Sequence, residues 1–247
     1  MPDRMSTATP GRGAAAEDID LFTPAAMPRL HAAAEEIAWL LGRGYPTPTV
    51  IRTVGDHHQL HARQRLALQR SICSAAQRAD RHARVVSEEA LCGRDLAVDA
   101  FNLIVTLEVA LSGGVLLAGT DGALRDLAGL RGNYRLIDET EAALVLLGDA
   151  VTALGVASLS FLVDAPVSNS GRLRGRILDH AARWPAAVTA TLVPDADPAL
   201  AGKERVVSSD SMVIDTSVSW VSLAAWIVRT RIPNAWLVDL TPSSSIP

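Results

Sequence analysis

Short apolar runs alternate with longer segments from residue 93 onward, and this alternation limits the possible folds more than any other feature of the sequence. Runs of strand length lie at 96–101, 115–118, 156–163, 187–193, 205–208 and 236–240. Helical segments fit between them, at 103–111, 139–154, 171–184 and 218–229. Strands that alternate with helices of this length are typical of βαβ units. The pattern therefore predicts an α/β three-layer sandwich with a mostly parallel, Rossmann-like sheet.

The sequence before residue 93 indicates helices. Leu30, Ala34 and Ile37 recur at helical spacing, Gly42 ends that helix, and Thr47 can begin the next one. The first residues contain few large apolar side chains, so burial cannot offset the entropy lost on ordering them. We expect a disordered tail at 1–20, a helical arm at 21–92, an α/β domain at 93–241 and a short tail at 242–247.

Composition places the chain among globular proteins. Its 247 residues, 49% of them hydrophobic, can bury one large core and carry an appendage. The net charge of -4 argues against a wholly basic surface for nucleic acid. No secretory signal and no uncharged run long enough to span a membrane is found, so we expect a cytoplasmic protein without membrane contact. The oligomeric state is left open.

Aspartates stand at or just beyond the ends of apolar runs at five places, namely Asp99, Asp121, Asp164, Asp210 and Asp215. In open α/β sheets such positions meet in the crevice outside the carboxyl ends of the strands. Carboxylates gathered there repel one another unless a divalent cation neutralises them. We therefore predict a Mg²⁺ or Mn²⁺ site with Asp99, Asp164, Asp210 and Asp215 as ligands and Asp121 as a secondary candidate.

Two short polar stretches are the strongest candidates for catalysis. Asp99 ends the first predicted strand and Asn102 begins the next helix, while Ser208, Ser209 and Asp210 follow a later strand. A buried aspartate needs a cation, an arginine or backbone amides. We assign catalytic roles to Asp99, Asn102 and Asp210. The alternative for both stretches is that these residues only cap helices, which aspartate, asparagine and serine do well.

A polar turn after the strand that ends at Asp164 predicts a phosphate site. It consists of Ser168, Asn169, Ser170, Gly171 and Arg172. Free amides and the positive end of a helix dipole attract anions, and the arginine adds charge. The turn lacks the spacing and the lysine of a nucleoside-triphosphate loop. An ordinary strand-to-helix connection is the alternative.

Three further features are ambiguous. Glu108 lies in an otherwise apolar helix, and we expect it on an exposed stripe. An inward-facing carboxylate is the alternative, so Glu108 is also a secondary candidate for the site. The basic residues between 56 and 83 indicate either a solvated helix face or a surface for RNA or another partner. His57, His58 and His61 lie close together but lack the adjoining glutamate of a zinc-protease helix, so we do not expect zinc there.

The motifs resemble those of a family of prokaryotic proteins classed as a domain of unknown function. The stretches that carry this resemblance are DAFNLIVTLEVALSGG, TDGALRDLAG, DAPVSNSGRL and SSDSMVID. The arm sequence RGYPTPTVIRTVGDHHQL is similar to the leading segment of the same family. The resemblance covers most of the chain that we expect to be ordered.

A more distant likeness is to the PIN-like nucleases, in particular their NYN branch. Asp99 and Asn102 match the Asp-x-x-Asn motif of that group, and Ser208 with Asp210 matches part of its Ser-x-Asp-Ser-Asp motif. Met212 stands where the second aspartate of that motif is expected. The resemblance implies a PIN-like fold and a Mg²⁺- or Mn²⁺-dependent endoribonuclease acting on RNA. The alternative is a non-catalytic module that binds a nucleotide or phosphorylated metabolite at residues 168–171.

Overall fold

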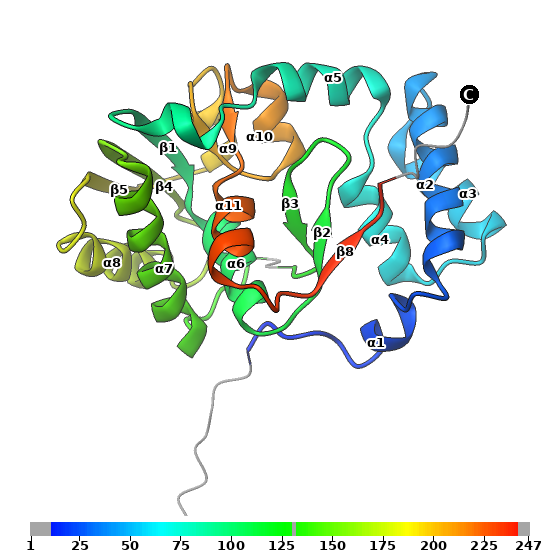
Figure 1. Ribbon diagram of the computed structural model, residues 1–247, viewed down its shortest axis with the longest axis horizontal. Helices are drawn as coiled ribbons and strands as arrows, with labels where there is room; N and C mark the ends of the chain where they lie inside the picture. Colours follow the sequence, from blue (N-terminus) through cyan, green and yellow to red (C-terminus); the bar gives the residue numbers. More distant parts are fainter. Residues whose placement is uncertain (1–10, 130–131, 242–247) are drawn as a thin grey trace, which may run out of the picture.

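A computed structural model describes residues 11–129 and 132–241 of the chain (Figure 1). Its α-helices are α1 (Asp18–Leu21), α2 (Met27–Gly42), α3 (Thr47–His57), α4 (Ala62–Ser71), α5 (Ala75–Arg84), α6 (Ala100–Leu111), α7 (Asp138–Leu154), α8 (Ser170–Ala181), α9 (Ala196–Leu200), α10 (Ser211–Thr216) and α11 (Leu223–Arg231). A short 3-10 helix, η1 (Glu88–Leu91), precedes the first strand. The strands are β1 (Asp95–Asp99), β2 (Leu116–Ala118), β3 (Leu124–Asp126), β4 (Ser158–Asp164), β5 (Ala187–Val193), β6 (Val206–Val207), β7 (Trp220–Val221) and β8 (Leu237–Asp239).

The main sheet has five strands in the order β5-β4-β1-β6-β7, and all neighbouring pairs are parallel. Helices cover both of its faces, so the predicted α/β three-layer sandwich is confirmed. The predicted helices before β1 are also present. Because the strands are parallel, the residues that follow β1, β4 and β6 meet at one edge of the sheet.

Successive side chains of β1 pack into the layers on opposite faces of the main sheet. Leu96 and Val98 are 2% and 0% exposed and belong to the large core that includes α6, α7 and α11. Ala97, between them, packs in a smaller cluster with Leu200 of α9 and Val213 of α10 on the opposite face. Successive side chains of a strand point to opposite faces, and a strand covered on both faces is apolar throughout. Asp99 is the first carboxylate after this apolar run and lies where the strand ends.

A second sheet corrects the prediction for two strands. β2 and β8 lie in a separate three-stranded sheet, order β3-β2-β8, in which β2 pairs with β3 in antiparallel fashion. The sequence does not predict β3, which contains Arg125 and Asp126, or β7, which lies inside the segment 218–229 predicted to be a helix. The predicted helix at 218–229 is also shifted, since residues 220–221 form β7 and α11 begins at Leu223. In Figure 1, α6 lies between the two sheets.

The helical arm packs on this second sheet. Leu30 of α2 and Leu68 of α4 share one core with Leu117 of β2 and with Val238 and Leu240 at the C-terminal end of the described chain. The arm and the end of the α/β region are therefore joined by apolar burial, which is the main favourable contribution to such packing. Figure 1 shows α2 to α4 beside β2 and β8.

Residues 11–20 correct part of the predicted N-terminal tail. Residues 1–10 and 242–247, where we expected tails, lie outside the described part of the chain, but residues 11–20 pack against the fold. Arg12 donates from its backbone to Ser112 at 3.0 Å and pairs through its side chain with Glu108. Asp18 is 0% exposed and accepts two hydrogen bonds from Arg63. Specific polar contacts hold this segment, and its composition alone does not reveal them.

Within residues 11–129 and 132–241, no helix has both the length and the apolar content needed to cross a membrane.

Candidate functional site

Asp99 caps helix α6 from the end of β1. Its Oδ1 accepts a hydrogen bond from the Asn102 backbone amide at 3.3 Å, and its Oδ2 accepts one from the Ser208 hydroxyl at 2.9 Å. The side chain is buried, with 6% exposure. Burial raises the pKa of Asp99 to about 7, and the charges of Asp164 and Asp197 contribute to the rise. The capping role is therefore real, but two hydrogen bonds do not overcome the cost of desolvating the charged form.

The segment after β6 wraps around the start of α6. Asn102 Oδ1 accepts hydrogen bonds from the Ser209 backbone amide at 2.7 Å and from its hydroxyl at 3.0 Å. Ser208 Oγ accepts from the Asp210 amide at 3.1 Å, and Asp210 in turn caps α10 by accepting from Met212 N at 2.7 Å. The structure thus brings together Asp99, Asn102 and Asp210, the three residues predicted to be catalytic.

Four carboxylates, from Asp99, Asp164, Asp197 and Asp210, gather at the carboxyl end of the main sheet; we call them the acidic edge. Asp164 ends β4 and accepts a hydrogen bond from the Ala196 amide at 2.7 Å. The pKa of Asp197 is raised by partial desolvation and by neighbouring carboxylates that include Asp164 and Asp210. Within residues 11–129 and 132–241, none of these four carboxylates forms an ion pair with a basic side chain. The ion pairs of this part of the chain involve other aspartates and glutamates.

The acidic edge supplies the donor type that Mg²⁺ prefers, but it is an open arrangement. Among the described residues, the group of His, Cys, Asp or Glu side chains that places three ligand atoms within 4.8 Å of one another lies elsewhere, on α2 and α3. Mg²⁺ commonly keeps several waters and is held by one or two carboxylates. A cation at this edge therefore fits a partly hydrated site rather than a closed protein cage.

Asp121 and Asp215 do not belong to the acidic edge, which corrects their assignment as metal-site residues. Asp215 is held by two hydrogen bonds from Arg81, both 2.7 Å. Asp121 is 1% exposed and bonds to Arg81 and to both terminal nitrogens of Arg125. Burial alone would raise the pKa of Asp121, but the two guanidinium groups outweigh it and hold the pKa below its usual range. Both carboxylates are already neutralised by the protein.

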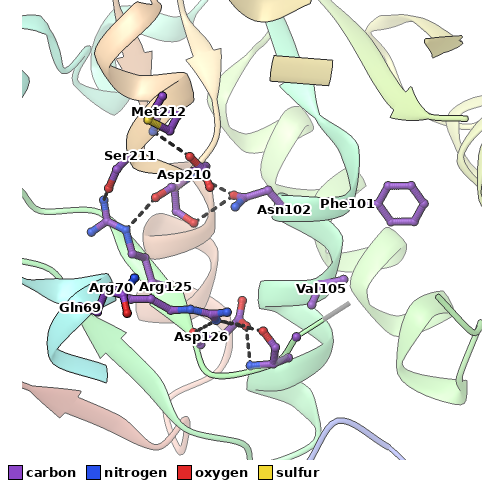
Figure 2. Close-up of a pocket in the computed structure, with 13 residues that line it drawn as sticks. Gln69, Arg70, Phe101, Asn102, Val105, Arg125, Asp126, Asp210, Ser211 and Met212 are labelled. Atoms are coloured by element: carbon purple, nitrogen blue, oxygen red, sulfur yellow. Dashed lines mark hydrogen bonds and ion pairs between the residues drawn. The ribbon is translucent and has the colours of Figure 1, made fainter. Parts of the chain in front are cut away.

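A groove of about 380 Å³ adjoins the acidic edge. Asn102 and Asp210 line one wall, and Arg70 of α4 lies across from them with Asp126 of β3 (Figure 2). Arg70 Nη1 donates to the backbone carbonyls of Asp126 and Ala128 at 2.6 and 2.9 Å. Its side chain is 33% exposed, so its other donors can reach solvent. Asp210 is therefore shared between the acidic edge and a groove that has a cationic wall.

Arg125 also lines this groove, but its donors are already used. Its Nε donates to the Ser209 carbonyl at 2.8 Å, and its terminal nitrogens bond to Asp121 and Ser211, as Figure 2 shows for the Ser211 contact. The arginine is 5% exposed. It therefore positions the 209–211 segment and is not free to bind a ligand.

The side chains of the predicted phosphate turn already form hydrogen bonds with the protein backbone. Ser168 Oγ accepts from the Tyr134 amide at 2.9 Å and donates to the Tyr134 carbonyl at 3.1 Å, and Asn169 Nδ2 donates to the same carbonyl at 2.7 Å. Ser170 Oγ donates to the Ala165 carbonyl at 3.1 Å. Asn169 has φ 61, a left-handed conformation that asparagine tolerates. These side chains anchor residues 134 and 165, while Gly171 and Arg172 are exposed at the start of α8.

Glu108 faces inward, contrary to our expectation of exposure. It is 0% exposed and accepts hydrogen bonds from Tyr134 Oη at 2.6 Å and from Thr140 Oγ1, while Arg12 pairs with its second oxygen. The carboxylate thus joins α6, α7 and the N-terminal segment in one buried polar network. It lies apart from the acidic edge and serves the fold.

Two members of the site were missed by sequence reasoning. Asp197 lies between Pro194 and Pro198, and such a local sequence is typical of a solvated loop. Arg70 was one of many basic residues in the arm, and nothing in its local spacing separates it from its neighbours. Only the packing of α4 and α9 against the α/β core selects these side chains.

Comparisons with known proteins find two family models that match the chain. The model of the family described as "Domain of unknown function (DUF5616)" matches residues 88–226, which is more than half of the 247-residue chain. The chain belongs to this family. A second family model, "Protein of unknown function (DUF434)", matches residues 29–84, within the helical arm. The predicted resemblance to a family of unknown function is confirmed.

A relative from a methanogenic archaeon extends the match across both regions. The "Uncharacterized protein MJ0935" of Methanocaldococcus jannaschii is 26% identical over 182 residues, which cover 74% of this chain and 87% of that protein. No solved structure matches the chain significantly. Since these relatives carry no named activity, the function has to be inferred from the site itself.

Proposed function

We propose that the protein is a Mg²⁺- or Mn²⁺-dependent endoribonuclease whose acidic edge holds the cation. The observation that supports this proposal is a contrast between two sets of aspartates. Asp121 and Asp215 are paired with arginine, whereas Asp99, Asp164 and Asp210 have no basic partner among the described residues. Carboxylates that lie together without compensation destabilise the protein, and a divalent cation relieves their repulsion.

Asp99, Asp164 and Asp210 would supply the carboxylate oxygens for the cation. When bound, the cation would lower the pKa of a coordinated water and neutralise charge that develops on a phosphate. Ser208 keeps the Asp99 carboxylate in place through the 2.9 Å hydrogen bond. Asn102 fixes the backbone just before Asp210 through its two bonds to Ser209. These contacts pre-organise the ligands, so less conformational entropy is lost when the cation binds.

The proposed substrate is RNA that lies in the groove beside Asp210. A volume of about 380 Å³ is within the range of pockets that hold small ligands, and here it fits one nucleotide unit of a longer strand. Arg70, on the opposite wall, can bind a backbone phosphate as a charged donor. RNA is chosen over other phosphodiesters because Asp99, Asn102, Ser208 and Asp210 resemble the motifs of PIN-like ribonucleases.

A phosphate or nucleotide site at residues 168–171 is the weaker alternative. The hydrogen bonds of Ser168, Asn169 and Ser170 to backbone carbonyls occupy the side chains that would have to bind the ligand. Arg172 remains exposed at the helix start, but a single surface arginine is a weak basis for recognition.

Titration with Mn²⁺ during thermal unfolding tests the cation site. We expect Mn²⁺ to raise the melting temperature of the wild-type protein by a few degrees, because a ligand that binds only the folded state stabilises it. Asp99→Asn should lose most of this shift. Asp95→Asn is the matched control, since Asp95 lies at the other end of the same strand and is exposed. Equal shifts in both variants would exclude Asp99 as a ligand.

Cleavage of a mixed RNA pool with Mg²⁺ or Mn²⁺ tests the activity. Asp99→Asn and Asp210→Asn should abolish cleavage and leave the melting curve in EDTA at or above that of the wild type, and Asp95→Asn should cleave normally. Cleavage that survives both substitutions at the acidic edge would refute the mechanism. A cation-dependent melting shift without cleavage of any RNA would refute the nuclease and leave the cation site standing.

A further inference from the structure

Helices α2 and α3 bring Glu36, His57 and His58 together at the surface of the arm. Glu36 lies on α2, His57 is the last residue of α3, and His58 is its C-cap. One ligand atom from each of the three side chains lies within 4.8 Å of the other two. We propose that these residues form a binding site for Zn²⁺, separate from the acidic edge and independent of the function proposed above.

The distances suit tetrahedral coordination. Glu36 Oε1 lies 3.1 Å from His58 Nε2. With metal-ligand bonds of about 2.0–2.2 Å, two ligands of a tetrahedral zinc ion are roughly 3.3–3.5 Å apart. The Glu36 and His58 atoms are therefore already at nearly the required separation. His57 is exposed, so its ring can turn toward the pair without disturbing the core.

The state of His58 provides a second observation. Its Nε2 is buried and makes no hydrogen bond within the described structure. The Glu36 oxygen lies 3.1 Å from this nitrogen, but the angles of the contact are not those of a hydrogen bond. Buried polar atoms of this kind are rare and require a partner. A cation coordinated by both this nitrogen and the carboxylate oxygen would supply that partner. The neighbouring rings of His57 and His58 meet edge to face, with centroids 4.8 Å apart.

The ligand set selects zinc over the cation proposed for the acidic edge. Imidazole nitrogen suits Zn²⁺ and neighbouring transition metals, whereas Mg²⁺ requires oxygen. Three protein ligands leave the fourth tetrahedral position to water. Glu36 is 45% exposed, so the ion can enter from solvent. Because Glu36 and the histidines belong to different helices, the bound ion would cross-link α2 to the end of α3 and stabilise the arm.

The nearby His61 is not part of this site. Its Nδ1 accepts a hydrogen bond from the Arg63 amide at 3.3 Å and caps α4. In the sequence, His57 and His61 are the pair with metal-ligand spacing, but in the structure His57 lies beside His58 and beside Glu36 of α2. That is why the spacing of the histidines alone does not predict zinc.

Calorimetric titration of the metal-free full-length protein with Zn²⁺, in excess Mg²⁺, tests the proposal. We expect one Zn²⁺ per chain and a melting temperature that rises with Zn²⁺. His57→Ala should weaken binding by more than about tenfold, since even outer-shell partners of a metal contribute that much. Glu36→Gln should weaken it in the same direction. His82→Ala, which removes an exposed histidine on α5, is the control and should bind as the wild type does.

His57 is the preferred position for substitution because it is exposed, so its variant should keep the wild-type melting temperature in EDTA. Substitution with Co²⁺ gives an independent readout, a visible absorption band typical of tetrahedral coordination that should be absent in His57→Ala. Wild-type affinity for Zn²⁺ in both His57→Ala and Glu36→Gln would overturn the proposal. Loss of Zn²⁺ binding in Asp99→Asn together with retention in His57→Ala would place the ion at the acidic edge and would also overturn it.

Discussion

Arg81 of α5 binds Asp215 of α10 through two parallel hydrogen bonds, Nε to Oδ1 and Nη2 to Oδ2, each 2.7 Å long. The Nη1 group of the same arginine donates to Asp121, also at 2.7 Å. Burial by itself would lower the pKa of Arg81, but the two carboxylates more than compensate and raise it. Arg81, from the helical arm, and Arg125 thus neutralise Asp121 and Asp215. This pairing excludes both aspartates from the candidate cation site.

Replacement of Arg81 should destabilise the fold strongly. Arg81→Ala leaves Asp121 with Arg125 as its basic partner and leaves Asp215 with no basic partner among the described residues. Breaking a buried ion pair from one side costs about 3–5 kcal/mol. Urea denaturation should show this loss in the free energy of unfolding. Arg78→Ala, on an exposed face of the same helix, should change it by less than about 0.5 kcal/mol. Similar losses in the two variants would contradict a structural role for Arg81.

Asp99 should make the stability of the metal-free protein depend on pH. Its pKa is raised to about 7 in the folded state by burial, whereas an unfolded aspartate titrates at about 4. Between these values the folded protein retains a proton that the unfolded chain has released. The contribution of Asp99 to stability is therefore fully present below about pH 4 and is lost as the pH rises to about 7, with a total on the order of 2–4 kcal/mol.

Melting temperatures measured in EDTA across this range would check the assignment. Asp99→Asn should flatten the decline between pH 4 and 7 and should be more stable than the wild type at pH 8. Asp95→Asn should retain the wild-type decline. A pH profile that is the same for Asp99→Asn and the wild type would show that the carboxyl is not the titrating group.

Tyr134 should contribute to stability through Glu108. Its hydroxyl donates to the buried carboxylate at 2.6 Å, and a hydrogen bond to a charged group contributes about 1.5–3 kcal/mol. Tyr134→Phe should lower the free energy of unfolding by about this amount, because Glu108 then loses a donor that water cannot replace. Tyr45→Phe is the control, since Tyr45 is 53% exposed. Chemical denaturation of the two variants gives the comparison, and an unchanged Tyr134→Phe protein would refute the contribution.

Arg70 and Arg172 distinguish the groove from the turn at 168–171 as the RNA contact. If RNA lies in the groove, Arg70→Ala should weaken binding several-fold and reduce the dependence of the affinity on salt by about one phosphate contact. Arg172→Ala should have little effect. Binding of a short single-stranded RNA at several salt concentrations measures both quantities. The reverse result, a loss only in Arg172→Ala, would favour the turn.

The sequence by itself determined the parallel α/β architecture, the helices that precede it and the position of Asp99 between a strand and a helix. These properties depend on residues that are close in the chain. The apolar run 96–98 followed by Asp99 and Asn102 is enough to end a strand and cap a helix. For the same reason the motifs around these residues identify the family, even though they do not identify an activity.

Tertiary structure decided which charges remain uncompensated. In sequence, Asp210 and Asp215 look alike, since each follows the same strand within a few residues. Arg81, 134 residues before Asp215, neutralises one of them and leaves the other at the acidic edge. The pairing of Glu36 with His57 and His58, the burial of Glu108 and the second sheet have the same origin. Each depends on how separate elements pack together. Local spacing in the sequence does not predict which side chain from a distant element will contact a given residue.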